Sequence, residues 1–324
     1  MATIMVGMAF FVVAFIVPFV FSCLSTLFFR FLAHKIGILD KPNGGLKTHK
    51  KPVAYLGGVA IFFATTVSYL LLRPFFPQTS FMIISPYYFL GLVALLVIGL
   101  IDDIFTISPF QKLVGQCIAC IFFLQAGLYF KEPFLVLFLP KIFCFPESLF
   151  FMGVGLSLWW MLSIINAINL IDIMDGLATV VSFVALVGMA LCSGAIDQGI
   201  LLVPFLGVLV GFFLYNKPQA SIYLGDAGSL VLGGILATTP FILGWGTTVH
   251  LGKIIAPFII LMIPIGEMCW LIGIRTRLNI PFYYGSPHHF ALYFKRWGWS
   301  IENILRITGL GGIFFIALAR FVAF

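Results

Sequence analysis

The sequence predicts an all-α protein that crosses a membrane about ten times. Of its 324 residues, 62% are hydrophobic and only 9% are charged. Soluble domains typically carry about 25% charged residues, so this chain has too few to cover a water-exposed surface. Apolar runs close to the roughly 20 residues that cross the hydrocarbon of a bilayer recur along its whole length. These observations predict one integral-membrane domain spanning residues 1–324.

Ten segments fit the length and composition of membrane-spanning helices. They lie near 5–29, 54–72, 82–101, 112–128, 149–168, 177–194, 199–215, 228–247, 254–273 and 302–322. The first is not expected to be a cleavable signal, because no basic region precedes it and no small-residue cleavage site follows it. Residues 129–148 contain Pro133, Pro140 and Pro146. This stretch is predicted to form a short re-entrant or surface hairpin, since it is too short and too rich in proline to span.

The basic residues distinguish the two sides of the predicted bundle. With ten spans, 13 of the 18 lysines and arginines fall on one side and five on the other. Positive residues concentrate on the cytoplasmic side of membrane proteins, so the first side is expected to be cytoplasmic and both termini to lie outside. The formal net charge of +7 follows from this topology and does not indicate a nucleic-acid partner.

Acidic residues gather at the predicted cytoplasmic ends of the spans. Six of the eleven lie there: Asp40, Asp102, Asp103, Asp172, Asp175 and Asp226. Carboxylates at a membrane edge are costly unless they face water, a cation or a partner. Any single one is as readily explained as a helix cap in a solvated loop. As a set bracketed by apolar sequence, they favour a functional site.

Asp102 and Asp103 end the third predicted span. Adjacent residues diverge on a helix, so one is expected to face a metal or substrate while the other orients a neighbour. Lys112 follows one loop later, where it would screen the two carboxylates or bind phosphate.

A second motif has polar residues at every third position: Asn166, Asn169, Asp172 and Asp175. Three residues turn a helix through about 300°, so the first and last of these would point in opposite directions on one continuous helix. We therefore expect the motif to straddle a break between two spans. Gly176 would relax the backbone there, and all four polar groups would face one cavity.

Two further motifs lie nearer the C-terminus. Gly225-Asp226-Ala-Gly228-Ser229 opens the eighth predicted span. Glycines beside an aspartate and a serine at a helix N-terminus favour a phosphate or metal–phosphate cradle, although such a turn is also a common helix start.

His288 and His289 lie in the loop before the last span, near four basic residues. Adjacent imidazoles seldom share one ion, so anion binding is favoured over metal ligation, with a solvated loop as the alternative. Glu267, inside the ninth span, is expected to be buried with a partner.

Together these motifs favour a magnesium-bound diphosphate at the cytoplasmic edge of the membrane. Hard cations prefer carboxylate oxygens, and Mg²⁺ commonly bridges protein carboxylates and substrate phosphates. A transporter would instead carry its charges near the bilayer midplane on broken helices. The chain lacks the phosphate-binding loop of ATPases, so an ATP-driven pump is not expected.

The motifs resemble, in order and spacing, those of the polyprenyl-phosphate N-acetylhexosamine-1-phosphate transferases, glycosyltransferase family 4. The matching residues run along nearly the whole chain: His49-x-x-Pro52 with Gly57-Gly58, Asp102-Asp103, Lys112-x-x-x-Gln116, Asn166-x-x-Asn169-x-x-Asp172-x-x-Asp175-Gly, Gly225-Asp226-x-Gly-Ser, Glu267 after Pro264, and Pro-His288-His289. The resemblance implies a bundle of ten or eleven helices, often dimeric, with a cytoplasmic active-site groove in the bacterial inner membrane.

The resemblance also implies roles for individual residues. Asp226 would hold Mg²⁺, or Mn²⁺ in its place, while Asp102 and Asp103 would serve the metal or accept the proton of the lipid phosphate. These three form the predicted catalytic and metal-binding set. The predicted substrate-binding set is His49, Lys112, Asn166, Asn169, Asp172, Asp175, His288 and His289.

The implied reaction is attack by the phosphate oxygen of undecaprenyl phosphate on the sugar-linked phosphorus of a UDP-N-acetylhexosamine. UMP leaves, and the lipid-linked sugar starts a cell-envelope polysaccharide such as lipopolysaccharide. The expected donor is UDP-N-acetylglucosamine. Residues 39–52 resemble the first cytoplasmic loop of transferases that initiate O-antigen or teichoic-acid-type polymers. Muramoyl-pentapeptide transferases also usually carry a third histidine where this chain has Pro287.

Three alternatives stay open on sequence alone. One is a phospho-N-acetylmuramoyl-pentapeptide transferase, which shares the motifs. The second is a CDP-alcohol phosphotransferase, although its motif wants Ala-Arg soon after Asp-Gly and this chain has Thr179 after Ala178. The third is a lipid-linked sugar transporter, which would show flux without release of UMP.

Overall fold

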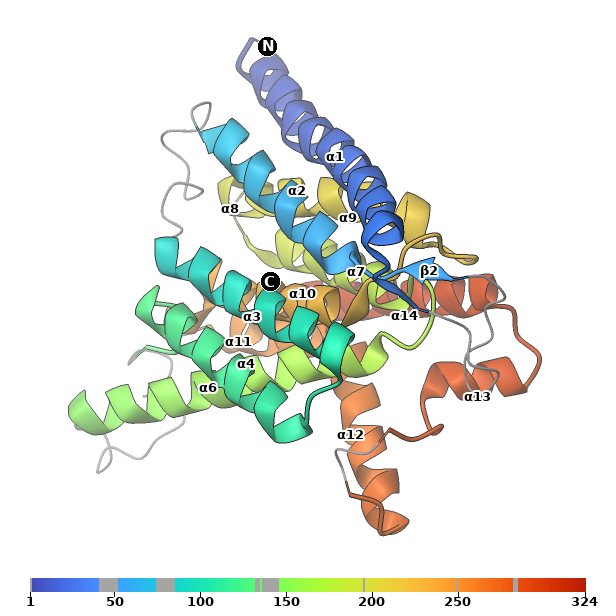
Figure 1. The fold of residues 1–324 in the computed structure, drawn as a ribbon. Coiled ribbons are helices and arrows are strands. Elements are labelled where there is room, and N and C mark those ends of the chain that lie inside the picture. Colours follow the sequence, from blue (N-terminus) through green and yellow to red (C-terminus); the bar gives the residue numbers. More distant parts are fainter. Residues whose placement is uncertain are drawn as a thin grey trace.

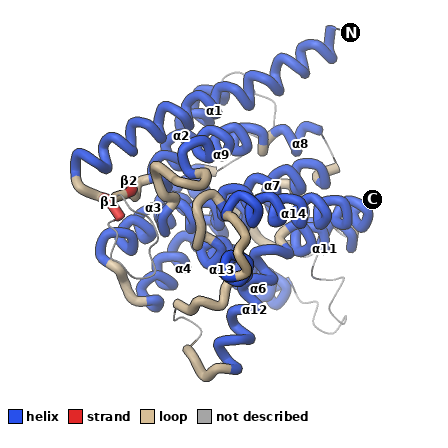
Figure 2. Tube along the Cα trace, turned by 90° about the vertical axis from the view of Figure 1, so that its right-hand side faces the viewer, coloured by secondary structure: helices blue, strands red, loops and turns tan. Residues whose placement is uncertain are grey.

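The computed structural model describes residues 2–40, 52–73, 85–131, 135, 146–194, 196–248, 250–281 and 285–324. The described chain is a bundle of helices with one small two-stranded sheet (Figures 1 and 2). Six described helices are long and apolar enough to cross a membrane, or seven if the bent pair α11 and α12 counts as one span. An all-α polytopic membrane protein is confirmed, whereas the count of ten spans stays a prediction.

The helices of the first half of the chain are α1 (Ala2–Ile36), α2 (Gly57–Leu72), α3 (Pro86–Phe105), α4 (Pro109–Gln125) and α6 (Pro146–Ile171). The second half contains α7 (Leu177–Cys192), α8 (Ile196–Ile200), α9 (Val203–Asn216), α10 (Gly225–Ile242), the 3₁₀ turn η4 (Trp245–Thr247), α11 (Leu251–Ile260), α12 (Met262–Arg277), α13 (Phe290–Arg296) and α14 (Ile301–Ala323). Each segment predicted to span overlaps one of these helices or two consecutive ones.

Two Ser-Pro pairs set the starts of α3 and α4. The hydroxyl of Ser85 accepts from the backbone N–H of Tyr87, and Ser108 forms a capping box with Gln111. Proline suits the first turn of a helix because its missing N–H has no intrahelical partner there. α3 runs to Phe105, beyond its predicted end at residue 101. Its last turn carries both adjacent aspartates.

The ninth predicted span, 254–273, is wrong as one continuous helix. α11 and α12 meet at an angle of 66° around Leu261. Pro264 has no N–H to donate to the carbonyl of Ile260, so the chain cannot continue a regular helix through this point. After the bend, α12 runs away from the other helices (Figure 1).

The helix α10 forms the centre of the bundle. Of its span, 89% is buried, against 28% for α1 and for α14. α10 packs against α2, α3, α6 and α7. The indole N–H of Trp160 on α6 donates to the carbonyl of Ala237 at 2.9 Å. Because α10 lies between these four helices, its first turn places Asp226 among the ends of other helices.

The small sheet joins the loop before α2 to the loop before α10. Strands β1 (Leu39–Asp40) and β2 (Val53–Ala54) pair antiparallel, and Ala54 also bridges Ile222. His49 lies outside the described residues, as do residues 132–134 and 136–145 of the predicted hairpin. The hairpin and the role of His49 stay predictions.

Candidate active site

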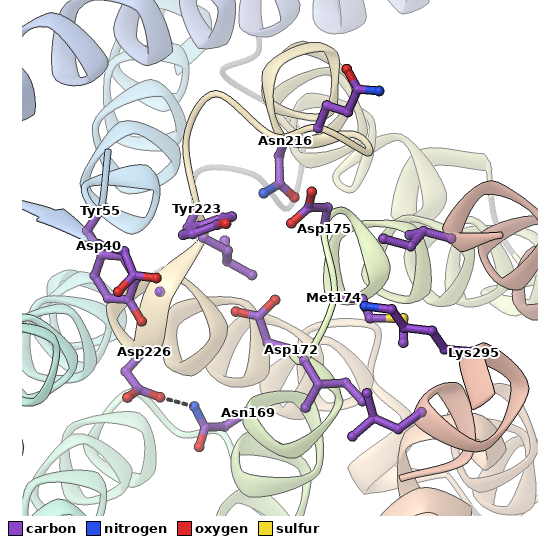
Figure 3. A pocket seen from close by; sticks show the side chains of 16 residues that line it. Asp40, Tyr55, Asn169, Asp172, Met174, Asp175, Asn216, Tyr223, Asp226 and Lys295 are labelled. Carbon is purple, nitrogen blue, oxygen red and sulfur yellow. Dashed lines mark hydrogen bonds between the residues drawn. The ribbon is translucent and has the colours of Figure 1, made fainter. Parts of the chain in front are cut away.

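A cavity of about 580 Å³ opens where α6 ends and α10 begins (Figure 3). Its polar lining comes from six separate parts of the chain: Asp40, Tyr55, Asn169, Asp172, Asp175, Asn216, Gln219, Tyr223, Asp226 and Lys295. Four of these carry carboxylates, and one lysine is the sole cation among the described lining residues. The cavity is therefore polar and predominantly acidic.

The predicted break in the Asn166–Asp175 motif is confirmed. α6 ends at Ile171 and α7 begins at Leu177, with Gly176 between them at a φ of +76°, which L-residues rarely adopt. Asp172 and Asp175 face the cavity from this break (Figure 3). Asp175 also accepts a hydrogen bond from the backbone N–H of Ala220 at 3.1 Å.

Asn166 does not face the cavity with the other three, so that part of the prediction is wrong. Its side chain pairs with Gln116 of α4 through two hydrogen bonds. Because Asn166 lies one turn inside α6, it points to the neighbouring helix, while Asn169 lies close enough to the helix end to reach the cavity.

Lys112 lies at the centre of a cluster built from four helices. Its Nζ is 2.9 Å from Asp102 Oδ2 and 2.8 Å from Asp226 Oδ1, and it donates to Asn169 Oδ1 at 3.1 Å. The amide of Asn169 in turn donates to Asp226 and, at 2.8 Å, to the hydroxyl of Ser229. We call Asp102, Lys112, Asn169 and Asp226 the lysine cluster.

The adjacent aspartates of α3 face different partners, as expected for neighbouring helix positions. The Asp103 carboxylate caps α10: Oδ1 accepts from the N–H of Asp226 at 2.7 Å, and Oδ2 accepts from the N–H of Ala227 at 3.0 Å. An anionic cap also interacts favourably with the helix dipole. Asp103 thus orients the backbone of Asp226, while Asp102 faces Lys112.

Close helix contacts at this point depend on glycine. A Cβ on Gly58 of α2 would overlap the backbone N of Gly228, and one on Gly99 of α3 would overlap the Cα of Ala227. α2 and α3 therefore approach the first turn of α10 more closely than any larger residue would allow. This packing explains in physical terms why the Gly57-Gly58 motif accompanies the aspartate motifs.

The two histidines are held outside this cavity. His289 Nδ1 lies 2.9 Å from Glu267 Oε1, and both side chains are buried. Glu267 also accepts from the N–H of Phe290 at 3.3 Å, so the prediction that it is buried with a partner is confirmed. His288 Nδ1 lies 2.8 Å from the hydroxyl of Tyr293. From this region Lys295 enters the described cavity lining, whereas neither histidine does.

Electrostatics within the cavity favour a bound cation. Burial, and then the charges of Asp226, Asp103 and Asp175, raise the pKa of Asp172 well above its usual value. Burial and nearby carboxylates also raise the pKa of Tyr223, to about 12. A bound cation would relieve the mutual repulsion of these carboxylates, and an anionic ligand would enter more readily beside it.

The donor chemistry fits a hard divalent cation shared with a substrate. Within the described ranges, no three His, Cys, Asp or Glu side chains converge into a ready metal site. Mg²⁺ is usually held by one or two carboxylates together with substrate phosphates, rather than by a cage made only of protein. Asp102 and Asp226 provide such carboxylates, although the Lys112 ammonium lies between them.

Comparison with known proteins agrees with this geometry. Residues 85–244, which contain the lysine cluster, match the family described as glycosyl transferase family 4. A probable undecaprenyl-phosphate N-acetylglucosaminyl 1-phosphate transferase of Bacillus subtilis is 34% identical over 273 residues, covering 83% of this chain and 72% of the relative. The chain belongs to glycosyl transferase family 4.

This glycosyl transferase family 4 member is also similar to phospho-N-acetylmuramoyl-pentapeptide-transferases. That of Streptococcus sanguinis is 30% identical, over 69% of this chain and 71% of the relative. That of Staphylococcus epidermidis is 28% identical, over 84% and 85% respectively. The family resemblance found in the sequence is confirmed, and membership in this family makes the chain a phosphosugar transferase.

Several cavity residues were absent from the predicted site. Tyr223 lies two residues before the Gly225-Asp226 motif and Tyr55 two residues before the Gly57-Gly58 pair, so proximity in sequence was an available signal for both. Lys295 lies six residues after His289. Asp40 was noted only as one of the acidic residues at helix ends. Asn216 had no signal, because it is a single polar residue at the end of an apolar segment.

Proposed function

We propose that the protein transfers N-acetylglucosamine 1-phosphate, or a close N-acetylhexosamine 1-phosphate, from its UDP-sugar to undecaprenyl phosphate and releases UMP. One observation carries the proposal: an acidic cavity at the ends of apolar helices adjoins a lysine bonded to Asp102 and Asp226. A water-soluble diphosphate and a membrane-bound phosphate meet most readily at such a boundary.

The cavity suits the donor nucleotide. Its volume of about 580 Å³ falls within the range of roughly 300–1,000 Å³ typical of small-molecule sites. Aromatic rings of Tyr55 and Tyr223 lie 6.2 Å apart, and the amides of Asn169 and Asn216 add hydrogen-bonding groups. Apolar, aromatic and amide groups together are what a nucleoside requires.

In the proposed mechanism, Asp226 and Asp102 would hold Mg²⁺, which would supply positive charge to neutralise the donor diphosphate. Lys112 moves its ammonium from the carboxylates to the phosphate oxygens of the substrates. Asp102 accepts the proton of the lipid phosphate, and Asp103 keeps Asp226 in place through its two backbone hydrogen bonds. A lipid phosphate oxygen then bonds to the sugar-linked phosphorus as the bond to UMP breaks. Alignment of two anions supplies most of the rate in such a reaction.

The setting we propose is the bacterial inner membrane with a cytoplasmic active site. The 13-to-5 distribution of basic residues supports this orientation. A homodimer is also part of the proposal, and cell-envelope polysaccharide synthesis is the pathway class that the reaction would start. The Bacillus subtilis relative, by its name, supports N-acetylglucosamine over other sugars.

A second candidate function differs only in the donor. Similarity to two phospho-N-acetylmuramoyl-pentapeptide-transferases favours a muramoyl-pentapeptide nucleotide as the alternative. The test is UMP release by the purified protein with undecaprenyl phosphate and each nucleotide in turn, with Mg²⁺, with Mn²⁺ and with a chelator. We expect metal-dependent turnover that is faster with UDP-N-acetylglucosamine. Faster turnover of the muramoyl donor would replace the proposed donor, and lipid-sugar flux without UMP would replace the reaction.

A further inference from the structure

A second polar layer joins α4 to α6 beside the lysine cluster. Gln116 Nε2 donates to Asn166 Oδ1 at 3.2 Å, and Asn166 Nδ2 donates to Gln116 Oε1 at 2.7 Å. The same Asn166 amide also donates to the carbonyl of Leu162 at 2.8 Å. Gln116 is only 1% exposed, and neither residue lines the described cavity.

This layer is one helical turn from the first. Lys112 and Gln116 are four residues apart on α4, while Asn166 and Asn169 are three apart on α6. Side chains at these spacings lie on the same face of a helix. The contact between Lys112 and Asn169 and the reciprocal amide pair are therefore consecutive layers of one helix–helix interface.

The amide pair resists sliding of the two helices. A displacement by one residue moves α4 about 1.5 Å along its axis, which would break both bonds. Each buried polar group left without a partner destabilises the displaced arrangement, because it has lost its bonds to water and gained none in the protein. A polar contact within an otherwise apolar helix interface is a well-attested means of fixing register.

Lys112 needs such a constraint more than its partners do. Its long, flexible side chain loses more rotamer entropy on being fixed than the shorter side chains of Asp102, Asn169 and Asp226 do. The ammonium must also stay near acceptors on α3, α6 and α10 at once. A displacement of α4 along its axis would move the ammonium away from all three acceptors.

We propose that Gln116 and Asn166 are positioning residues that fix the register of α4 against α6 and so hold the Lys112 ammonium against Asp102 and Asp226. The kinetic consequences rest on the proposed function, because they need turnover of a UDP-sugar. The placement of Lys112 does not, so it is measurable without any substrate.

The test uses the full chain in a lipid nanodisc and three variants. Gln116→Leu and Asn166→Leu each remove the pair, whereas the double exchange Gln116→Asn with Asn166→Gln keeps two facing amides. We expect kcat for UMP release to fall by about 10- to 10²-fold in each single variant, as for a displacement near 1 Å of a group that acts in the reaction. KM for the donor should change less, and the exchange variant should recover most of the rate.

A second measurement reports on Lys112 directly. Without substrate, an amine-acylating reagent and peptide mass spectrometry give the rate of modification at Lys112. This rate should rise in the single variants, because the ammonium leaves its carboxylate partners, and return toward the wild-type value in the exchange variant. Ser22→Ala is the matched control, since it removes a buried interhelical hydrogen bond to Val208 remote from the site. It should change neither measurement.

Three results would overturn the inference. One is wild-type kcat and Lys112 modification in the single variants. Another is a loss of kcat with unchanged modification at Lys112, which would mean that the pair acts through some other group. The third is an exchange variant as slow and as reactive at Lys112 as the single variants. If the wild-type protein released no UMP from any UDP-sugar, the proposed function would fail, and the modification rates would still decide the inference.

Discussion

The lysine cluster and the histidine segment, residues 285–290, hold their polar groups in different ways. Lys112 bonds partners on three other helices, so the cluster exists only when the bundle is assembled. The histidine segment is bonded chiefly to α12: Glu267 to His289, Trp270 to the carbonyl of His288, and Arg275 to Ser286. That helix diverges from α11 by 66°.

The two arrangements suit two different tasks of a site that binds two substrates. A cluster shared by four helices keeps its groups at fixed separations, which suits the alignment of reacting atoms. A segment attached to one projecting helix keeps its internal geometry while its position depends on that helix. We therefore expect substitutions in the cluster to reduce turnover, and substitutions in the histidine segment to reduce substrate binding and local stability.

The largest effect is expected at the cluster. Asp226→Asn keeps the shape of the side chain but removes the charge that a hard cation and Lys112 both need. Turnover should fall by about 10²- to 10³-fold, as when a principal transition-state contact is removed. The assay is UMP release, with thermal unfolding in detergent as the control for folding. Substantial turnover in this variant would contradict its assignment as the metal ligand.

Lys112→Met should reduce turnover somewhat less than Asp226→Asn does. It leaves Asp102 and Asp226 without their shared cation, and it removes one positive group from the phosphates. We expect kcat to fall by about 10²-fold and Lys112→Arg to restore little, because a planar guanidinium cannot replace a compact ammonium among three acceptors. Full activity in the methionine variant would show that the cluster has a structural role alone.

A smaller effect is expected from the histidine segment. His289→Ala removes the imidazole that contacts the buried Glu267 carboxylate at 2.9 Å, at a cost of about 1–3 kcal/mol. The unfolding temperature should fall and donor KM should rise, while the dependence on Mg²⁺ remains. His288→Ala should have a weaker effect of the same kind, since the contact that it removes is with the hydroxyl of Tyr293 rather than with a buried carboxylate. If either variant no longer bound Mg²⁺, the histidine segment rather than the lysine cluster would hold the metal.

The smallest effect is expected on stability at Asp172. Because its pKa is raised in the fold, the protein keeps this carboxyl protonated to higher pH than the unfolded chain does. The stability gained from that difference is complete below the ordinary carboxyl pKa of about 4 and is lost as pH rises through the raised value.

Asp172→Asn removes this titration. Without divalent cations, the variant's unfolding temperature should exceed the wild-type value by a margin that grows as the pH rises above the ordinary carboxyl pKa of about 4. The same measurement with Mg²⁺ present should narrow the margin, since a cation favours the ionised carboxylate. A margin independent of pH would mean that Asp172 does not titrate in this range.

The positions of the helices were largely predictable, because apolar length and proline placement act locally. The break at Gly176 followed from the spacing of four polar residues, and the structure has it. The bend at Leu261 was missed although Pro264 was visible, since membrane helices also tolerate proline when neighbouring groups satisfy the freed carbonyl.

The site was predictable as a set of residues but not as a set of contacts. Asp102 and Asp103 were expected to diverge, yet sequence could not say that Asp103 would cap a helix that begins 122 residues later, at Gly225. Asn166 was assigned to the cavity from the spacing of its motif and from the family resemblance. Which of its neighbours it would meet depends on how α4 lies against α6, and no local pattern encodes that.

The pairing of β1 with β2 has a consequence for the chain segment that joins the two strands. Asp40 lies opposite Val53 in the sheet, so the segment between them leaves and re-enters the fold at one place, beside a cavity that Asp40 lines. Doubling the length of a loop anchored this way costs only about 0.6 kcal/mol in closure entropy. A change in the length of residues 41–51 therefore leaves the pairing that holds the two flanking strands together in place. Lys112, Asp226 and their contacts lie on other elements, so such a change would also leave the lysine cluster in place.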